Sequence, residues 1–161
     1  MSRLRVVQTE KKGFGVFTQV DISRGTFVGE YVGEVITGGQ AKERLHLQQQ
    51  TSLPCYVVQY REHTGSGTVI TTNIDATYKG NVMRFVNHSC SPNLVMVAVR
   101  SNSVVPRLCL FACRPISAGE EVCFSYYGAS GAEINVDTLH LGKQPCYCGS
   151  ENCVDFLPLE L

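Results

Sequence analysis

Three cysteines lie within the eight residues CYCGSENC, at Cys146, Cys148 and Cys153. Thiolates this close together can bind one zinc ion, and Gly149 permits the tight turn that such a loop requires. A structural zinc ion takes four ligands in a tetrahedron, so a fourth ligand must come from elsewhere in the chain. The spacing favours a zinc site, with three metal-free or redox-active thiols as the alternative.

The other five cysteines and the four histidines could supply the fourth ligand. Cys109 and Cys113 lie in one strand-like run, where four residues span roughly 13 Å, so these two cannot share an ion. We expect them, together with Cys55 and Cys123, to be small core residues. Cys90 lies in a polar, turn-rich stretch and is the best remaining donor.

A second concentration of reactive side chains is the segment RFVNHSCSPN, residues 84–93. It combines amides, an imidazole, hydroxyls and a thiol directly after a short predicted helix. Asn, Ser and Pro are also ordinary turn residues, so a capped helix end would explain this composition equally well. Two further motifs favour a functional site: a Gly-x-Gly at Gly13 and Gly15, and the segment EEVCFSY at residues 120–126.

Short β-rich runs must position these motifs. Runs of β-branched and aromatic residues between turn signals are typical of strands, and the Gly-Ser-Gly turn at residues 65–67 predicts a hairpin. The predicted strands are 13–17, two within 26–36, 56–60, 68–74, an antiparallel pair at 94–100 and 107–113, and 121–126; the predicted helices are 39–50 and 80–86. Many short strands with few helices define a mainly β or α+β domain.

The composition limits the classes of protein that the chain can belong to. Its 161 residues suffice for one domain with a hydrophobic core, and its 17% charged residues argue against a coiled coil or a disordered tail. Because 14 basic residues balance 14 acidic ones, no basic excess drives general nucleic-acid binding. No apolar run approaches the roughly 20 residues of a membrane-spanning helix, and no secretory signal is expected. Outside the secretory pathway, cysteines are more often thiols or metal ligands than disulfides.

Five segments, in this order along the chain, resemble the SET domain of protein-lysine methyltransferases: KGFGVF, VGEYVGEVI, NIDATYKGN, RFVNHSCSPN and GEEVCFSYYG. The cysteine-rich tail is similar to the post-SET segment of that family. The resemblance implies a mainly β (α+β) fold, a SET-type β-clip of short sheets with a C-terminal pseudoknot and a zinc-bound tail. The implied division is a SET domain at 1–127, a flexible connection at 128–142 and a post-SET zinc segment at 143–161.

The resemblance also implies two cofactors, S-adenosylmethionine and zinc. The Gly-x-Gly is not followed by a predicted helix, which argues against a dinucleotide site. The implied residues for S-adenosylmethionine are Lys12, Gly13, Phe14 and Gly15 on one side and Asn87 and His88 on the other, with Tyr56 also touching it and Arg84 nearby. For Arg84, a structural ion pair is an equal alternative. The implied zinc ligands are Cys90, Cys146, Cys148 and Cys153.

By the same resemblance, three aromatic residues carry the catalysis. The pseudoknot would place Tyr126 beside Asn87 and His88, where its hydroxyl would orient the substrate amine. Tyr56 would line the lysine channel. Phe124 occupies a position that sets the number of methyl groups in relatives, and a phenylalanine there predicts at least dimethyl-lysine. Without the resemblance, Tyr56 is a strand tyrosine and Phe124 a core strand aromatic.

The function expected from the resemblance is protein-lysine N-methylation, on histone H3 or another lysine-containing protein, by a monomer in the nucleus and on chromosomes. Neither direct nucleic-acid binding nor a membrane association is expected. Two departures from the family pattern stand out: Ser125 replaces the usual Asp before the catalytic tyrosine, and the sequence contains no nine-cysteine pre-SET cluster. They favour, as an alternative, an inactive SET-like module that binds chromatin or a partner protein. A zinc or thiol module unrelated to methylation is a third possibility.

Overall fold

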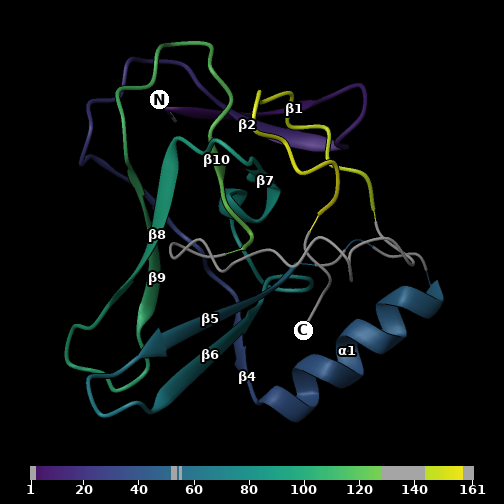
Figure 1. The fold of residues 1–161 in the computed structure, drawn as a ribbon, viewed down its shortest axis with the longest axis vertical. Helices are drawn as coiled ribbons and strands as arrows, with labels where there is room; N and C mark the ends of the chain where they lie inside the picture. Colours follow the sequence, from purple (N-terminus) through teal and green to yellow (C-terminus); the bar gives the residue numbers. More distant parts are fainter. Residues whose placement is uncertain (1–2, 52–53, 55, 128–143, 158–161) are drawn as a thin grey trace. The chain divides into compact units, whose positions relative to one another are not determined.

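The computed structural model describes residues 3–51, 54, 56–127 and 144–157, which are mainly in short strands (Figure 1). The chain divides into two compact units. Unit 1 comprises Met1–Gly29, Phe85–Val97 and Cys109–Leu159, and unit 2 comprises Glu30–Arg84, Ala98–Leu108 and Glu160–Leu161. The prediction of a mainly β protein is confirmed.

The described elements are ten strands, one α-helix and one 3-10 turn. The strands are β1 (Leu4–Gln8), β2 (Phe14–Thr18), β3 (Phe27–Glu30), β4 (Glu34–Ile36), β5 (Val57–His63), β6 (Val69–Asp75), β7 (Asn87–His88), β8 (Leu94–Val99), β9 (Arg107–Ala112) and β10 (Cys123–Phe124). The helix is α1 (Gly38–Thr51) and the 3-10 turn is η1 (Val82–Phe85). The strands form three sheets, in the orders β1-β2, β3-β9-β8-β10-β7 and β4-β6-β5.

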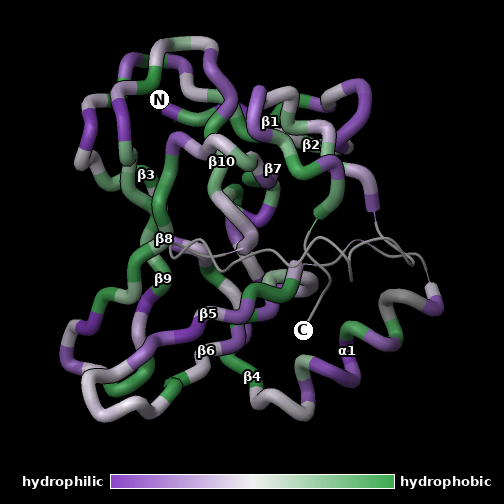
Figure 2. Tube along the Cα trace, viewed as in Figure 1, coloured by the Kyte–Doolittle hydropathy of each residue, from purple (hydrophilic) through white to green (hydrophobic). Residues whose placement is uncertain are grey.

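Unit 1 contains the β1-β2 ribbon and the pairing of β10 with its neighbours. β1 and β2 are antiparallel, whereas β10 runs parallel to both β7 and β8. The core includes the fully buried Val16, Leu110 and Val122. Burying an aliphatic side chain of this size contributes about 1.5–3 kcal/mol, so these residues hold β2, β9 and the approach to β10 in place. All six residues of β8, LVMVAV, are apolar, and the strand is drawn in the hydrophobic colour in Figure 2.

Unit 2 is built on the antiparallel β5-β6 hairpin, which pairs Val57 with Asp75 and His63 with Val69. Gly67 lies in the turn with φ +80°, a left-handed conformation that favours glycine. β4 pairs with the other edge of β6. Gly33 lies just before β4, and a Cβ there would meet the Asp75 carbonyl oxygen at 2.5 Å, so a side chain would push β4 away from β6.

Helix α1 begins with a capping box. The Thr37 hydroxyl accepts a hydrogen bond from the Gln40 N–H at 3.3 Å, and the Gln40 side chain accepts one from the Thr37 N–H at 2.9 Å. Ala41 and Leu45 are buried on one face of the helix, four residues apart. Among the described residues, no helix is long and apolar enough to cross a membrane.

A buried carboxylate fixes α1 to the sheet of unit 2. Asp75 is fully buried, and its carboxylate accepts hydrogen bonds from Arg44 Nη1 at 2.5 Å and from the Thr77 N–H at 2.8 Å. The same Arg44 nitrogen donates to Glu34 at 3.0 Å. Burial raises the pKa of Asp75, but the hydrogen bonds from Thr77 and Arg44 outweigh it, so the pKa lies below its usual value.

The element predictions agree with the structure in most places. The predicted hairpin of 56–60 with 68–74 corresponds to β5 and β6, and the predicted pair at 94–100 and 107–113 corresponds to β8 and β9, which are neighbours in one sheet. The two strands expected within 26–36 are β3 and β4, and the helix expected at 39–50 is α1.

Several finer predictions need correction or lie outside the described residues. The strand predicted at 121–126 is reduced to β10, because Glu121 forms only an isolated bridge with Phe17 and Tyr126 lies in a turn. The helix predicted at 80–86 is the shorter η1, and β1, with its mixed charged and apolar residues, was not predicted. Cys109 and Cys123 are core residues as expected, whereas Cys113 is only half-buried. Cys55 and the connection at 128–142 lie outside the described residues.

Candidate active site

The pairing of β7 with β10 brings two motifs of the sequence into contact within unit 1. Cys123 lies opposite Asn87 and Phe124 opposite His88. The buried Asn93 side chain reinforces this pairing, since its oxygen accepts the Cys123 N–H at 2.8 Å and its nitrogen donates to the Glu121 carbonyl at 2.8 Å. The segments around residues 84–93 and 120–126 therefore form one structural element despite their distance in the sequence.

Tyr126 is held by both its backbone and its side chain. Its N–H donates to His88 Nδ1 at 3.0 Å, and its hydroxyl donates to the Val86 carbonyl at 2.9 Å. Its ring lies 5.2 Å from the His88 ring and 4.9 Å from the Phe124 ring, centroid to centroid. Tyr126 is 43% exposed, whereas Phe124 is buried beneath it. The arrangement holds the accessible phenol of Tyr126 against the rings of His88 and Phe124.

His88 connects Tyr126 with the cysteine cluster. Burial lowers the pKa of His88 to about 4, so its ring is neutral at neutral pH. Because Nδ1 accepts the Tyr126 N–H, the ring proton lies on Nε2, which is 3.3 Å from Cys90 Sγ and donates to it. One neutral imidazole thereby orients both the turn of Tyr126 and the thiol of Cys90.

Residues 9–15, which we call the strap, lead into β2. Gly13 has φ +67°, and its carbonyl accepts the Thr9 N–H at 2.6 Å, which closes the loop. Phe14 is half-exposed and lies edge-on to Phe85, with ring centroids 5.6 Å apart. The predicted residues Gly13 and Phe14 thus belong to a tight loop that presents an aromatic ring at the surface.

The strap contacts the β7–β10 element through polar groups. The Asn87 side-chain nitrogen donates to the Phe14 carbonyl at 3.0 Å and to Glu121 Oε1 at 2.8 Å, and Lys12 forms an ion pair with Glu121. At Gly15, a Cβ would lie 2.6 Å from Glu121 Oε1. Unit 1 therefore brings together the strap, Asn87, His88, Phe124 and Tyr126.

The two remaining predicted site residues, Tyr56 and Arg84, lie in unit 2 and contact each other there. The Arg84 guanidinium is 5.3 Å from the centre of the Tyr56 ring, a cation-π contact. Arg84 also donates to the Ala76 carbonyl at 3.2 Å, and the Tyr56 carbonyl accepts the Tyr31 hydroxyl at 2.9 Å. These contacts of Arg84 are with a carbonyl and an aromatic ring, so its expected roles as a cofactor residue or in a structural ion pair both stay predictions.

Cys90, Cys146, Cys148 and Cys153 form a cluster in which all four sulfur atoms lie within 4.8 Å of one another. Zinc–sulfur bonds of 2.3 Å in a tetrahedron would place sulfurs about 3.8 Å apart, so the donor set and its spacing fit zinc. The pKa of Cys148 is lowered, because hydrogen bonds from the Cys90 backbone and Ser150 outweigh burial, and this favours a thiolate. Burial raises the pKa of Cys90 and Cys146. A cation would shift all four toward thiolates.

Three contributors to the site were not predicted from the sequence. Glu121 ion-pairs with Lys12 in the strap, and Tyr127 anchors the tail, since its hydroxyl donates to the Phe156 carbonyl at 3.0 Å and its ring lies 5.4 Å from that of His88. Asn152 also donates to the Cys90 carbonyl at 3.2 Å. The only signal in the sequence was the acidic and aromatic residues next to Tyr126. Such neighbours do not reveal which distant side chains they contact.

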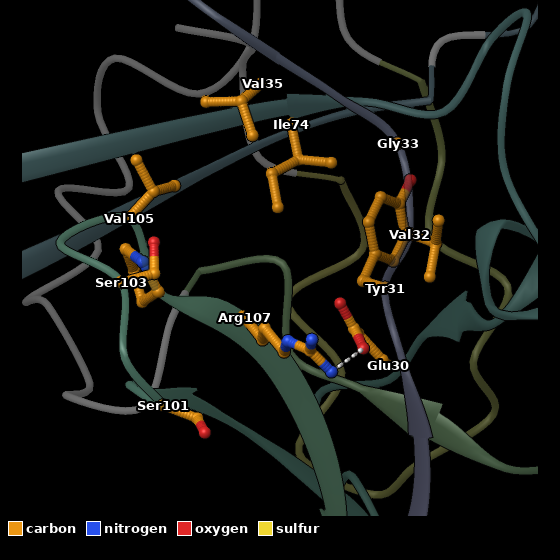
Figure 3. A pocket seen from close by; sticks show the side chains of 11 residues that line it. Glu30, Tyr31, Val32, Gly33, Val35, Ile74, Ser101, Ser103, Val105 and Arg107 are labelled. Carbon is orange, nitrogen blue, oxygen red and sulfur yellow. Dashed lines mark ion pairs between the residues drawn. The ribbon is translucent and has the colours of Figure 1, made fainter.

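Unit 2 also contains a hollow of about 280 Å³. Figure 3 shows Val35, Ile74 and Val105 around it, with Arg107 3.7 Å from the Glu30 carboxylate. None of the residues predicted for the site lines this hollow. The hollow is a partly apolar depression that is separate from the residues predicted to bind the cofactor and the substrate.

Comparison with known proteins identifies the class of the fold and the site. Residues 13–127 match the model of the SET domain family. The chain belongs to the SET domain family.

The most similar relatives include histone-lysine N-methyltransferase SETMAR of Rattus norvegicus, 45% identical over 98% of this chain and 51% of that protein. The Homo sapiens SETMAR is 43% identical over 97% of this chain and 23% of that protein, and SUVR3 of Arabidopsis thaliana is 42% identical over 98% and 45%. The crystal structure of the methyltransferase domain of human SETMAR matches with a TM-score of 0.83 and 38% identity, over 98% of this chain and 58% of that one. The details of the sequence predict a similarity to the SET region of SETMAR in particular, and that similarity is confirmed. The chain spans about half the length of the rat relative.

Proposed function

We propose that this protein is a histone-lysine N-methyltransferase that uses S-adenosylmethionine and acts on histone H3 or another lysine-containing protein in the nucleus, on chromosomes. The proposal is supported by membership of the SET family and by relatives with this activity in their names. The observation that carries it is Tyr126, whose phenol is fixed by His88 and Val86 and remains accessible. We further propose the division into a SET domain at 1–127 and a zinc-bound tail at 143–161.

The strap and β7 offer suitable groups for the cofactor. Phe14 presents a half-exposed ring, Gly13 is exposed, and the half-buried Asn87 has a side-chain oxygen that can accept a hydrogen bond. Lys12, Gly15, His88, Arg84 and Tyr56 complete the set expected from the resemblance. When bound, S-adenosylmethionine supplies the methyl group and a positive sulfonium charge.

The substrate lysine must lose a proton before it can attack. At its usual pKa of about 10.4, only about 0.04% of a free lysine is neutral at pH 7. A positive charge about 4 Å away disfavours the ammonium by about 4 kcal/mol at an effective dielectric of 20, which corresponds to about three pKa units. A nearby positive charge can therefore account for most of the decrease in pKa that makes the lysine amine neutral.

Tyr126 then orients that amine. A phenol oxygen can accept an N–H from the substrate while its own proton is donated to a carbonyl, here that of Val86. Holding the amine in this way aligns its lone pair for in-line attack on the methyl carbon. With the methyl donor bound, the bond from nitrogen to the methyl carbon would form as the bond from that carbon to sulfur breaks.

Phe124 supports multiple methylation. Its buried ring packs against Tyr126 and carries no hydroxyl that could bind the amine or a water molecule at the end of the channel. An untethered water is displaced more easily by a methyl group. We therefore propose a product of at least dimethyl-lysine.

Mass spectrometry of a histone H3 peptide panel, incubated with the protein and S-adenosylmethionine, tests this function. Mass increments of one, two or three methyl groups are expected on at least one peptide, and Tyr126→Phe should abolish most of them. Ser125, whose hydroxyl accepts the Tyr127 N–H at 3.3 Å, favours the second candidate, an inactive SET-like binding module. Peptide binding without any methyl transfer would support that module and contradict the enzyme.

A further inference from the structure

The carboxylate of Glu121 joins two parts of the candidate cofactor site. One oxygen pairs with the Lys12 ammonium and the other accepts the Asn87 amide at 2.8 Å. The side chains of Lys12 and Glu121 are only 20% and 16% exposed, so this ion pair is shielded from water more than an ordinary surface pair. Glu121 therefore holds the strap and β7 together.

The two ends of this connection are rigid. On the strap, the Lys12 N–H donates to the Thr9 hydroxyl at 3.0 Å, which fixes the loop from which the Lys12 side chain extends. On the other side, Glu121 bridges to Phe17, and its carbonyl accepts the buried Asn93 amide at 2.8 Å. A carboxylate anchored this firmly defines where the strap can lie.

Gly15 supplies the space that the carboxylate occupies. A Cβ at this position would lie 2.6 Å from Glu121 Oε1 and 3.0 Å from Asn87 Nδ2, so a side chain there would have to displace the Glu121 carboxylate. Gly15 has no left-handed backbone conformation, in contrast to Gly13 with φ +67°. The absence of a side chain at Gly15 therefore leaves the Glu121 carboxylate in the place where it meets Lys12 and Asn87.

We propose that Glu121 is a positioning residue that closes the strap through Lys12, and that Lys12 acts by this ion pair rather than as a direct ligand of the cofactor. The proposal rests on the proposed function, because the strap and Asn87 are the residues assigned to S-adenosylmethionine. In this arrangement, Lys12 and Glu121 shape the site, whereas Phe14 and Asn87 contact the ligand.

Binding of S-adenosylhomocysteine to the full chain, measured by calorimetry, tests this division. Lys12→Met and Glu121→Gln should each weaken binding about tenfold, and the double variant should be no weaker than either single one, because both remove the same ion pair. Lys12→Arg should retain most of the affinity. In methyl transfer, Lys12→Met should raise the KM for S-adenosylmethionine about tenfold and change kcat little.

Two control variants separate positioning from general stability. Glu120→Gln removes the neighbouring carboxylate, which pairs with Arg114 at 2.5 Å, and should lower the melting temperature without changing the affinity for S-adenosylhomocysteine. Lys42→Met removes one exposed lysine charge from α1 and should change neither quantity.

Amide hydrogen exchange of residues 9–15 without any ligand gives a second, independent measurement. The strap amides should exchange faster in Lys12→Met and Glu121→Gln than in the parent and in Lys12→Arg. If the parent does not bind S-adenosylhomocysteine, the proposed function fails, whereas this exchange result still decides on the strap. A loss of binding in Lys12→Met but not in Glu121→Gln would make Lys12 a direct ligand and overturn the proposal, as would unchanged exchange.

Discussion

Glu121 in unit 1 and Asp75 in unit 2 each bind one basic side chain and one further hydrogen-bond donor, yet their surroundings differ. Asp75 is fully buried and connects a helix to a sheet, whereas Glu121 is partly exposed and connects a surface loop to the β7–β10 element. Similar chemistry therefore supports the fold in one unit and the candidate site in the other. Substitution of Glu121 should therefore weaken cofactor binding, whereas substitution of Asp75 should lower the stability of the fold.

The largest effect is expected at Tyr126. Tyr126→Phe removes the hydroxyl that would orient the amine, so kcat should fall about 100- to 1,000-fold, while affinity for S-adenosylhomocysteine stays within a few-fold. Steady-state kinetics and calorimetry measure both. Asn87→Ala is the matched contrast and should weaken cofactor binding first, because it removes an amide proposed to bind the cofactor. An equal loss of affinity in Tyr126→Phe would show that the residue is structural.

The next effect concerns the tail of unit 1. Elemental analysis of protein purified without chelator should give one zinc ion per chain, held by Cys90, Cys146, Cys148 and Cys153. Removal of the metal, or Cys90→Ser, should make the tail at residues 144–157 sensitive to limited proteolysis, because a structural metal contributes folding energy directly. Cys113→Ser, outside the cluster, is the control. A chain free of zinc would contradict the site.

In unit 2, Asp75→Asn should destabilise the protein by about 3 kcal/mol, because Arg44 loses a buried charged partner. Chemical denaturation measures this, and Glu62→Gln, which breaks the surface pair with Arg100, should cost less than about 1 kcal/mol.

The folded pKa of Asp75 lies below its unfolded value of about 3.9, so the contribution of Asp75 to stability is complete above about pH 5 and is lost as the pH falls. The parent should therefore lose stability on acidification more steeply than Asp75→Asn; parallel curves would refute this role.

The smallest effect is a change of product rather than of rate. Phe124→Tyr should shift products toward monomethyl-lysine with little loss of the first transfer, since the new hydroxyl would hold a water where a methyl group must fit. Product distributions on one peptide at long incubation decide the matter. A parent that stops at monomethyl-lysine would refute the role of Phe124, and a destabilised Phe124→Tyr variant with an unchanged product ratio would make Phe124 a core residue only.

Much of the architecture could be predicted from local pattern. Alternating β-branched residues around a Gly-Ser-Gly turn specify the β5–β6 hairpin, and Thr37 with Gln40 begins a helix that needs only neighbours in the sequence. The clustered Cys146, Cys148 and Cys153 likewise indicate a metal loop, because the chelating groups are close along the chain. Such features depend on short-range geometry.

Tertiary structure decided the contacts between distant residues. The sequence alone, through its family resemblance, placed Tyr126 near Asn87 and His88, and the parallel pairing of β10 with β7 supplies that proximity. It did not assign Glu121 to Lys12 or Tyr127 to Phe156, because an ion pair or hydrogen bond between residues 109 or 29 positions apart leaves no local periodicity. Spacing specifies which groups can share a turn, whereas the packing of strands determines which distant side chains meet.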